Sequence, residues 1–497
     1  MSDNGTGTLI LIRLAGEVAT KSRQTRRHFQ RRLVTNLEDA LECSGVDFEV
    51  REGWGRLWVT ASSQAALDVV ARVFGIASIS LVEATAKPEL AAIIKTGDEV
   101  YADRVRGRTF AVRARRAGRH AFSSRDINYD LGAALDRHGD VDLGNPDVTV
   151  HVEVREDAAY FFSARIAGAG GLPLGVEGRA VALISGGYDS AVAAWMMMKR
   201  GVALDYVFCN LAGRAYERAV LSVAKTLSDE WGYGTRPQIH VIDFQGTVEH
   251  LSERVRRSYW QVILKRLMYR AAERVAHEIA AKAIVTGESV GQVSSQTLSN
   301  LCVIGDSVTT PVLRPLVGFD KEEIVRRSRD IGTYPLSEKV REYCALVERH
   351  PVTDAAPRAV ARQEAKLDLA VLEDAVAGRR VFDLRSLAAS DLVTPYLYTS
   401  EIPDGAMVID TRSEEQYGPW HYPGATRRGF WDLFRDFKRL ERDRTYVLYC
   451  ELGLKTAQLA EKMQRAGFEA YSFKGGVPAL RAYVESTEPG RRPARTP

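Results

Sequence analysis

The stretch VALISGGYDSAVAAWMMMKRG, residues 181–201, decides the fold of the middle of this chain. A short apolar run leads into a glycine-containing turn, and an apolar segment of helical length follows. Further apolar runs, LDYVFCNL, QIHVIDF and AKAIVTGES, alternate downstream with helical segments. Buried strands that alternate with helices predict a doubly wound parallel sheet.

The turn SGGYDS (185–190) has the features of a phosphate-binding loop. Gly186 and Gly187 let the backbone approach a phosphate closely, and the N-terminus of the following helix attracts anionic oxygens. Asp189 could hold Mg²⁺, which prefers oxygen ligands, and Ser185 and Ser190 could donate hydrogen bonds. No Gly-Lys-Ser/Thr follows, so this is not a Walker A loop. The alternative is an ordinary glycine turn between a strand and a helix.

SGGYDS resembles the PP-loop, SGGxDS, of ATP pyrophosphatases that adenylate their substrates. TGESVGQVSSQTLSN (286–300) and RPLVGFDKEEI (314–324) resemble the TGE-x-x-GQVSSQT-x-x-N and RPL-x-x-x-DK segments of 4-thiouridine synthetases, the ThiI family. The resemblance implies that Lys321 stabilises charge during adenylation. It also implies ATP contacts at the PP-loop and around it: Leu183, Ile184, Ser185, Gly186, Gly187, Asp189, Ser190, Lys265, Gly287 and Gln296.

Cys450 ends the apolar run TYVLY and opens the loop CELGLKT before a helix. A sulfur that faces backbone N–H groups and a helix N-terminus is stabilised as the nucleophilic thiolate, and the same pocket could stabilise a persulfide. The segment IDTRSEEQYGPWHYPGA (409–425) resembles the signature of rhodanese domains, with Tyr422 where Ile is usual. The alternative is an inert cysteine buried in a strand.

The other cysteines stand at 43, 209, 302 and 344, and no pair has CxxC spacing. The segment REYCALVERHP around Cys344 resembles a PEYC-like segment of the ThiI family, which implies that Cys344 pairs with Cys450 in a disulfide. We interpret Cys43, Cys209 and Cys302 as structural. So few thiols in 497 residues fit a reducing compartment, and we expect a cytoplasmic protein.

Basic residues are concentrated in the N-terminal part, although the net charge is only +4. Six Lys or Arg and no acid lie between Lys21 and Arg32, and seven Arg and no acid lie between Arg104 and Arg119. In RTFAVRARR, apolar Phe110, Val112 and Ala114 alternate with arginines, which predicts a half-buried strand with a cationic outer face. Such clusters are typical of contact with a phosphate backbone, although they also serve solubility.

LIRLAGEVATKSRQTRRHFQRRL (11–33) resembles the ferredoxin-like domain of the ThiI family, with its E-x-x-x-KS motif at Glu17, Lys21 and Ser22. GRTFAVRARRAGRHAFSSRDIN (107–128) and NPDVTVHVEV (145–154) resemble a THUMP domain, an RNA-binding module. The residues that we expect to contact RNA are Lys21, Arg23, Arg27, Arg113, Arg115, Arg116 and Arg119.

The predicted fold class is multidomain α/β and α+β, because the resemblance reaches nearly the whole chain. We expect a ferredoxin-like domain at 1–60, a THUMP domain at 61–166, a PP-loop domain at 167–395 and a rhodanese domain at 401–487. A helical segment over about 357–377 is expected to lead away from the third domain. No run of 18 apolar residues exists, so no membrane span is expected.

The resemblance implies ATP- and Mg²⁺-dependent sulfur transfer to a uridine of tRNA, at position 8 in the family, through an adenylated uracil. It also implies a cysteine desulfurase as sulfur donor and a thiamine-pathway sulfur carrier as a second partner. A homodimer is a further hypothesis, because one protomer could hold a tRNA end while the other modifies it. Two alternatives stay open. One is a PP-loop ligase or amidotransferase that acts on a small metabolite, and the other is an RNA-binding sulfur carrier without ATP turnover.

Overall fold

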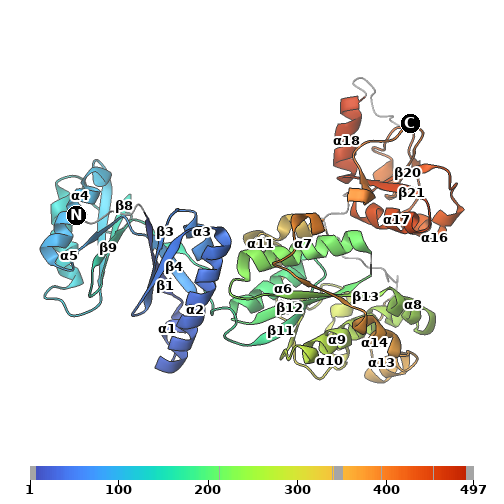
Figure 1. Cartoon of the computed structure of the whole chain (residues 1–497), viewed down its shortest axis with the longest axis horizontal. Helices are drawn as coiled ribbons and strands as arrows, with labels where there is room; N and C mark the ends of the chain where they lie inside the picture. The colour runs from blue at the N-terminus through green and yellow to red at the C-terminus, as the bar shows by residue number, and fades with distance from the viewer. Residues whose placement is uncertain are drawn as a thin grey trace. The chain divides into compact units, whose positions relative to one another are not determined.

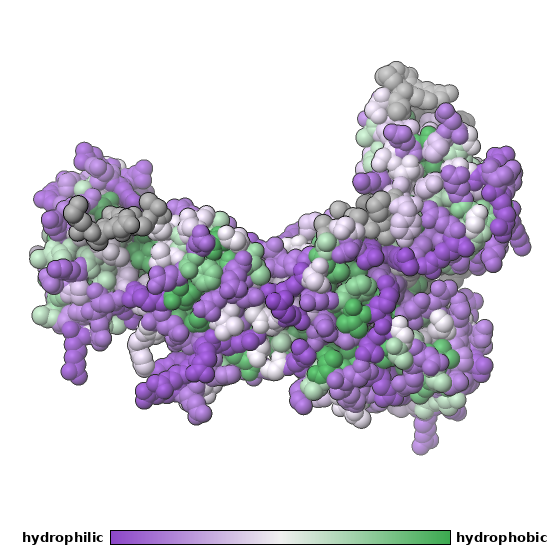
Figure 2. Space-filling view, viewed as in Figure 1, coloured by the Kyte–Doolittle hydropathy of each residue, from purple (hydrophilic) through white to green (hydrophobic). Residues whose placement is uncertain are grey.

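The computed structural model describes residues 7–211, 213–338, 340, 351–392, 395–451 and 453–487, with four sheets among them (Figure 1). The chain divides into two compact units. One contains residues up to 177 with 198–202 and 230–235, and the other contains the remainder. No helix in the described ranges combines the length and the apolar character needed to span a membrane. The face of the molecule in Figure 2 carries mostly hydrophilic side chains, with small apolar patches between them.

The first sheet is antiparallel, in the order β10-β4-β1-β3-β2. Its strands are β1 (Thr8–Leu14), β2 (Phe48–Gly53), β3 (Arg56–Ala61), β4 (Ile76–Leu81) and β10 (Ile166–Ala167). Helices α2 (Arg23–Ser44) and α3 (Ala66–Ala71) bury Leu33, Leu37 and Val70 in the same core as Ile10 and Val59. Ser22 caps the start of α2, and Gly45, with φ of 68°, ends it.

This sheet does not end at the division that we expected after residue 60. β4 pairs with β1 from Ile10 opposite Leu81 to Leu14 opposite Ile76, so residues up to Leu81 belong to the first domain. The pairing of β10 with β4 also brings residues 166–167 back to it. Strand pairing depends on tertiary contacts, and the sequence around residue 60 does not indicate which later strand pairs with β1.

The second sheet has the order β5-β9-β8-β6-β7. Its strands are β5 (Ala84–Ala86), β6 (Thr109–Arg116), β7 (Asp140–Val141), β8 (Val148–Val154) and β9 (Ala159–Phe162). β6 runs parallel to β7 and β8, and the other pairs are antiparallel. Helices α4 (Leu90–Val105) and α5 (Ser124–Asp136) share a buried core with Phe110 and Val112. The alternation predicted for β6 is confirmed, because Arg113 and Arg115 are exposed.

The third sheet has the order β15-β14-β11-β12-β13-β16 and confirms the predicted doubly wound parallel architecture. Its strands are β11 (Arg179–Leu183), β12 (Ala203–Asn210), β13 (Gln238–Asp243), β14 (Ile284–Val285), β15 (Val312–Leu313) and the antiparallel β16 (Arg380–Asp383). Along the chain, β12 and β13 are added on one side of β11, and β14 and β15 are then added on its other side. Ligands of such sheets bind at this reversal, beyond the carboxyl ends of the strands.

The helices of this domain include α6 (Tyr188–Lys199), α7 (Arg214–Trp231), α8 (Gln245–Arg254), α9 (Trp260–Glu278), α10 (Leu298–Gly305) and α11 (Lys321–Asp330). The segment over 357–377 is helical as predicted and forms α13 (Pro357–Glu364) and α14 (Ala370–Ala377), but it does not lead away from the domain. Val360, Leu372 and Val376 from these helices are buried in the domain core. The segment therefore completes the domain, because its apolar face covers α9.

The fourth sheet is parallel, in the order β17-β21-β20-β18-β19. Its strands are β17 (Tyr398–Thr399), β18 (Met407–Asp410), β19 (Thr426–Arg427), β20 (Thr445–Tyr449) and β21 (Glu469–Phe473). Helices α16 (Phe430–Asp436), α17 (Leu454–Arg465) and α18 (Gly476–Thr487) accompany it. Leu448 and Val447, adjacent in β20, lie in different apolar clusters, as expected for a central strand covered on both faces.

Candidate functional site

The predicted phosphate loop lies between β11 and α6, at the reversal in strand order. Gly186 has φ of 77°, which a residue with a side chain rarely adopts. The hydroxyl of Ser190 accepts a hydrogen bond from the Ser185 amide at 3.2 Å and lies 3.2 Å from the Gly187 carbonyl. These contacts hold a tight turn at the start of α6.

Gly287 packs directly on this turn. A Cβ at this position would lie 2.5 Å from the carbonyl carbon of Asp189 and 2.6 Å from the amide nitrogen of Ser190. Only glycine permits so close an approach, so the loop after β14 forms one wall of the site.

Asp189 is the charged centre of the site and is 5% exposed. Lys321, the first residue of α11, donates to its two carboxylate oxygens at 2.9 and 3.0 Å. Gln292 donates to one of them at 2.9 Å. Lys321 was predicted, but Gln292 was missed, because a neutral amide within a Ser- and Gln-rich loop carries no chemical signal of its own.

The described part of the chain holds no group of three or more His, Cys, Asp or Glu that could bind a metal ion. The Asp189 carboxylate still fits Mg²⁺, which is commonly held by one or two carboxylates together with phosphate oxygens and water. A metal ion there would compete with Lys321 for the same oxygens.

A second, buried carboxylate organises the wall beside the loop. Glu288 contacts Lys265 at 3.4 Å and accepts from Arg314 at 3.0 Å, from Thr286 at 3.1 Å and from the Tyr269 hydroxyl. Burial alone would raise the pKa of Glu288, but Lys265, the Tyr269 hydrogen bond and Arg314 hold it below its usual value. Lys265, an expected ATP contact, is therefore oriented by Glu288, which the sequence did not single out.

Gln296 supplies the clearest sign of an absent partner. Its side chain is 7% exposed, and its Oε1 atom has no hydrogen-bond partner among the described residues. An unpaired buried acceptor is costly unless a ligand satisfies it. The exocyclic amino group of adenine is a donor of the required kind, so this residue fits ATP. Of the other expected contacts, Leu183 is the last residue of β11, and Ile184 follows it directly before the loop.

Cys450 lies where the sequence predicted, directly after β20 and before α17. The residue is partly exposed, and its sulfur accepts from the Gly453 amide at 3.2 Å and lies 3.6 Å from the Thr456 hydroxyl. The Ser472 hydroxyl bonds to the Gly453 carbonyl at 2.8 Å and to Thr456 at 2.7 Å, which anchors the loop on β21. The interpretation as an inert, buried strand cysteine does not apply.

The rhodanese-like signature forms the support behind this loop. Asp410 and Arg412 are both buried, and they form a salt bridge at 2.8 Å. Arg412 also donates to the Trp420 carbonyl at 2.7 Å and lies 3.6 Å from Glu451, the residue after Cys450.

The remaining cysteines differ in their surroundings. Cys344 lies outside the described residues. Cys209 is buried in β12, and burial raises the pKa of its thiol, which agrees with a structural role. Cys43 and Cys302 are exposed.

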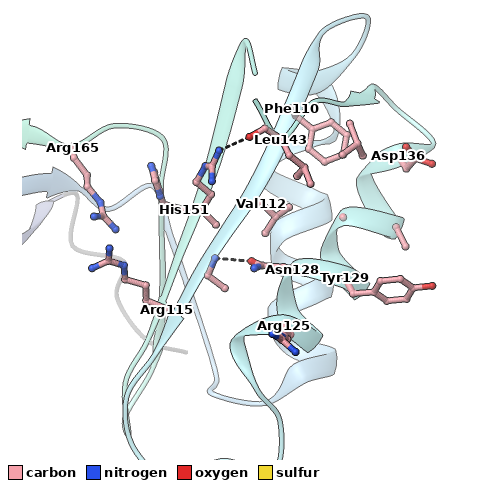
Figure 3. Close-up of a pocket in the computed structure, with 15 residues that line it drawn as sticks. Phe110, Val112, Arg115, Arg125, Asn128, Tyr129, Asp136, Leu143, His151 and Arg165 are labelled. Atoms are coloured by element: carbon pink, nitrogen blue, oxygen red, sulfur yellow. Dashed lines mark hydrogen bonds between the residues drawn. The ribbon is translucent and has the colours of Figure 1, made fainter. Parts of the chain in front are cut away.

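A cationic cavity of about 960 Å³ is lined mainly by residues of β6 and α5 (Figure 3). Arg113 and Arg115, two of the residues expected to contact RNA, line it together with residues that the sequence did not single out, including Arg125, Tyr129, His151 and Arg165. Arg116 and Arg119 do not line it. In Figure 3, the side chain of Arg115, from β6, and that of Arg165, from the loop before β10, extend toward each other.

The charges around this cavity are poorly compensated. Burial and then the nearby Arg115 lower the pKa of Arg165. Burial, then Arg165 and Arg13, lower the pKa of His151 to about 4, so this ring is neutral at pH 7. Neighbouring guanidinium groups with few carboxylates between them suit the phosphates of a nucleic acid.

Of the basic residues expected on the first domain, Arg23 and Arg27 lie exposed in the first two turns of α2. Lys21 is exposed just before the helix, with its ammonium 5.6 Å from the centre of the Phe29 ring.

Four family models match the chain in succession. They describe a ThiI ferredoxin-like domain over 9–80, a THUMP domain over 83–163, a thiamine biosynthesis protein (ThiI) over 175–369 and a rhodanese-like domain over 395–483. A tRNA sulfurtransferase of Desulfurococcus amylolyticus is 39% identical over 481 residues, which cover 96% of this chain and 99% of that protein. A tRNA sulfurtransferase of Proteus mirabilis is 34% identical, with 92% of this chain and 98% of that protein covered.

Among solved structures, a 4-thiouridine synthetase in complex with RNA and bound ATP is similar. Its TM-score is 0.68 at 31% identity, with 76% of this chain and 99% of that chain covered. A Pyrococcus horikoshii protein matches with a TM-score of 0.53 at 25% identity, over 65% of this chain and 99% of that one.

Proposed function

Because this chain belongs to the ThiI family of tRNA sulfurtransferases, we propose that it activates a uracil of tRNA with ATP and replaces the activated oxygen with sulfur carried on Cys450. The observation that carries the proposal is the contact of Lys321 with both oxygens of Asp189, at the turn where the phosphates of a nucleotide would lie. The contact supports the proposal because a cation and a candidate metal ligand lie together at the predicted phosphate loop.

In the first step, O4 of the uracil attacks the α-phosphorus of ATP, the bond to the β-phosphate breaks and pyrophosphate leaves. The amides of residues 185–190 and Lys321 stabilise the charge that develops on the phosphates. Mg²⁺ held by Asp189 would neutralise phosphate charge in the same step. The adenylated uracil then has AMP as its leaving group at C4, which is far better than an oxygen anion.

In the second step, a persulfide on Cys450 supplies the sulfur. Its outer sulfur attacks C4, AMP leaves, and the Cys344 thiolate attacks the inner sulfur of the adduct, which releases 4-thiouridine. Alternatively, Cys344 attacks the persulfide first and frees sulfide, which then attacks C4. Both routes leave a Cys344–Cys450 disulfide, which a dithiol reductant must reopen.

Several parts of this proposal concern partners. A cysteine desulfurase would load Cys450, the target would be the uridine at position 8, and the loaded Cys450 could also pass sulfur to a carrier protein of thiamine synthesis. A homodimer would let one protomer hold the RNA while the other modifies it.

ATP–pyrophosphate exchange with and without tRNA tests the proposal against its two alternatives. We expect exchange that depends on unmodified tRNA. Exchange with a small metabolite and without RNA would instead indicate a ligase or amidotransferase. Tight tRNA binding without any exchange would indicate a sulfur carrier with an inactive nucleotide site.

A further inference from the structure

A second cavity lies in the first domain, between α2 and the hairpin that joins β2 to β3. Its volume is about 520 Å³. Trp54 stands at the tip of the hairpin and is 77% exposed. Gly55 follows it with φ of 67°, so the turn is tight and presents the indole outward. A tryptophan side chain that is left this exposed is unusual and suggests a binding role.

The wall opposite the tryptophan is cationic. Arg23, Arg26, Arg27 and Arg31 of α2 line the cavity, and Glu52 is its one acidic residue. Gln30 already donates to Glu52 at 2.8 Å, and within the described ranges none of the four guanidinium groups forms an ion pair with a carboxylate. Arg32 on the same helix is different, because it donates to the Leu174 carbonyl at 2.8 Å.

Arg26 connects the two walls. The carbon at the centre of its guanidinium group lies 4.3 Å from the centre of the Trp54 ring. This cation–π contact holds the indole in place, and the high exposure of Trp54 leaves the rest of the ring available.

We propose that this cavity binds an unpaired nucleotide of the RNA substrate, with its base stacked on Trp54 and its phosphates held by Arg23, Arg27 and Arg31. The inference rests on the proposed function for the identity of the ligand. An aromatic face beside unneutralised arginines is the arrangement that binds single-stranded nucleic acid. A base within a duplex offers no free face, and an acidic peptide offers no flat ring to stack.

Two kinds of variant separate stacking from charge. Binding of the full-length protein to tRNA and to a mixed-sequence single-stranded RNA would be measured over a range of salt concentrations. Trp54→Ala should weaken binding about tenfold at every salt concentration, because stacking does not release counterions. Trp54→Phe should recover most of this loss. Arg31→Gln should reduce the slope of log K against log salt by about 0.7–0.9.

The controls decide between this inference and the function on which it rests. A blunt RNA duplex should bind wild type and Trp54→Ala equally. The inference would be overturned if Trp54→Ala bound single-stranded RNA with wild-type affinity. It would also be overturned if a poly-aspartate peptide competed for binding in a manner that depends on Trp54. Continued thiolation of tRNA by the wild type would show that the proposed function still holds in either case. A wild-type chain that neither binds nor thiolates tRNA would refute the proposed function itself.

Discussion

Lys321 donates to both carboxylate oxygens of Asp189, although 132 residues separate them in the chain. The contact joins the first residue of α11 to the second residue of α6. It pairs the buried Asp189 carboxylate with a cation in the absence of a nucleotide. Under the proposed function, Lys321 would exchange Asp189 for phosphate oxygens of ATP.

Replacement of this lysine should affect the chemical step. Lys321→Met is expected to lower tRNA-dependent ATP–pyrophosphate exchange by about 100-fold, because it removes a preorganised cation from the transferring phosphate. The dissociation constant for ATP should change much less. Arg327→Met on the same helix, which removes an exposed ion pair with Asp330, is the matched control and should keep wild-type exchange. Equal losses in both variants would contradict a role in catalysis.

Gln296 should recognise the amino group of adenine. Wild type is expected to discriminate about tenfold against an ATP analogue without that group, because the buried Oε1 atom would stay unpaired. Gln296→Ala should bind both nucleotides with similar affinity, and competition binding measures both values. Discrimination that persists in Gln296→Ala would place the adenine elsewhere.

Cys450 should be required for sulfur transfer. Cys450→Ser is expected to abolish 4-thiouridine in tRNA, measured by mass spectrometry of nucleosides, while ATP–pyrophosphate exchange continues. Cys302→Ser, which removes another exposed thiol, should leave the thiouridine content unchanged. Undiminished 4-thiouridine after Cys450→Ser would refute the assigned role.

The cavity beside β6 should contribute charge to RNA binding. Arg115→Gln and Arg165→Gln are each expected to reduce the slope of log K against log salt by about 0.7–0.9, because each leaves one RNA phosphate without its guanidinium partner. Arg106→Gln is the control, because Arg106 lies in the same basic stretch but pairs with Asp103 at 2.7 Å. Unchanged slopes in the first two variants would exclude phosphate binding at this cavity.

His240 should make the parallel sheet sensitive to acid. Its Nδ1 atom accepts from Arg379 at 3.2 Å, and burial and then Arg379 lower its pKa to about 4. The unfolded chain binds a proton near pH 6.5 and the folded chain does not, so stability falls as the pH drops from about 6.5 toward 4. The loss of stability for this group is about 2 kcal/mol at pH 5.

Hydrogen exchange of the β13 amides at pH 7 and pH 5, corrected for the intrinsic rate, measures this effect. His240→Gln keeps an acceptor for Arg379 but cannot titrate, so protection should fall less in the variant than in wild type. An equal fall in both would assign the acid sensitivity to other groups.

The parts of the fold and site that the sequence predicted depend on local properties. The glycine turn of residues 185–190, the alternation in β6 and the loop at Cys450 each follow from spacing, side-chain size and backbone freedom within a few residues. Phe110 is buried and Arg113 is exposed because successive side chains of a strand point to opposite faces. Lys321 was predicted only from the resemblance to the ThiI family, because no local pattern distinguishes it from a surface lysine.

Tertiary structure alone decided the contacts between distant segments. Three of these contacts are made by residues in loops, which only the packing of the sheets brings to their partners. Gln292 donates to Asp189, and Glu288 contacts Lys265. Arg165 lies near Arg115. The pairing of β4 with β1 and the burial of Val360 and Leu372 depend likewise on which apolar faces meet. Sequence therefore determined which chemistry each loop carries, whereas packing through space determined which loops act together.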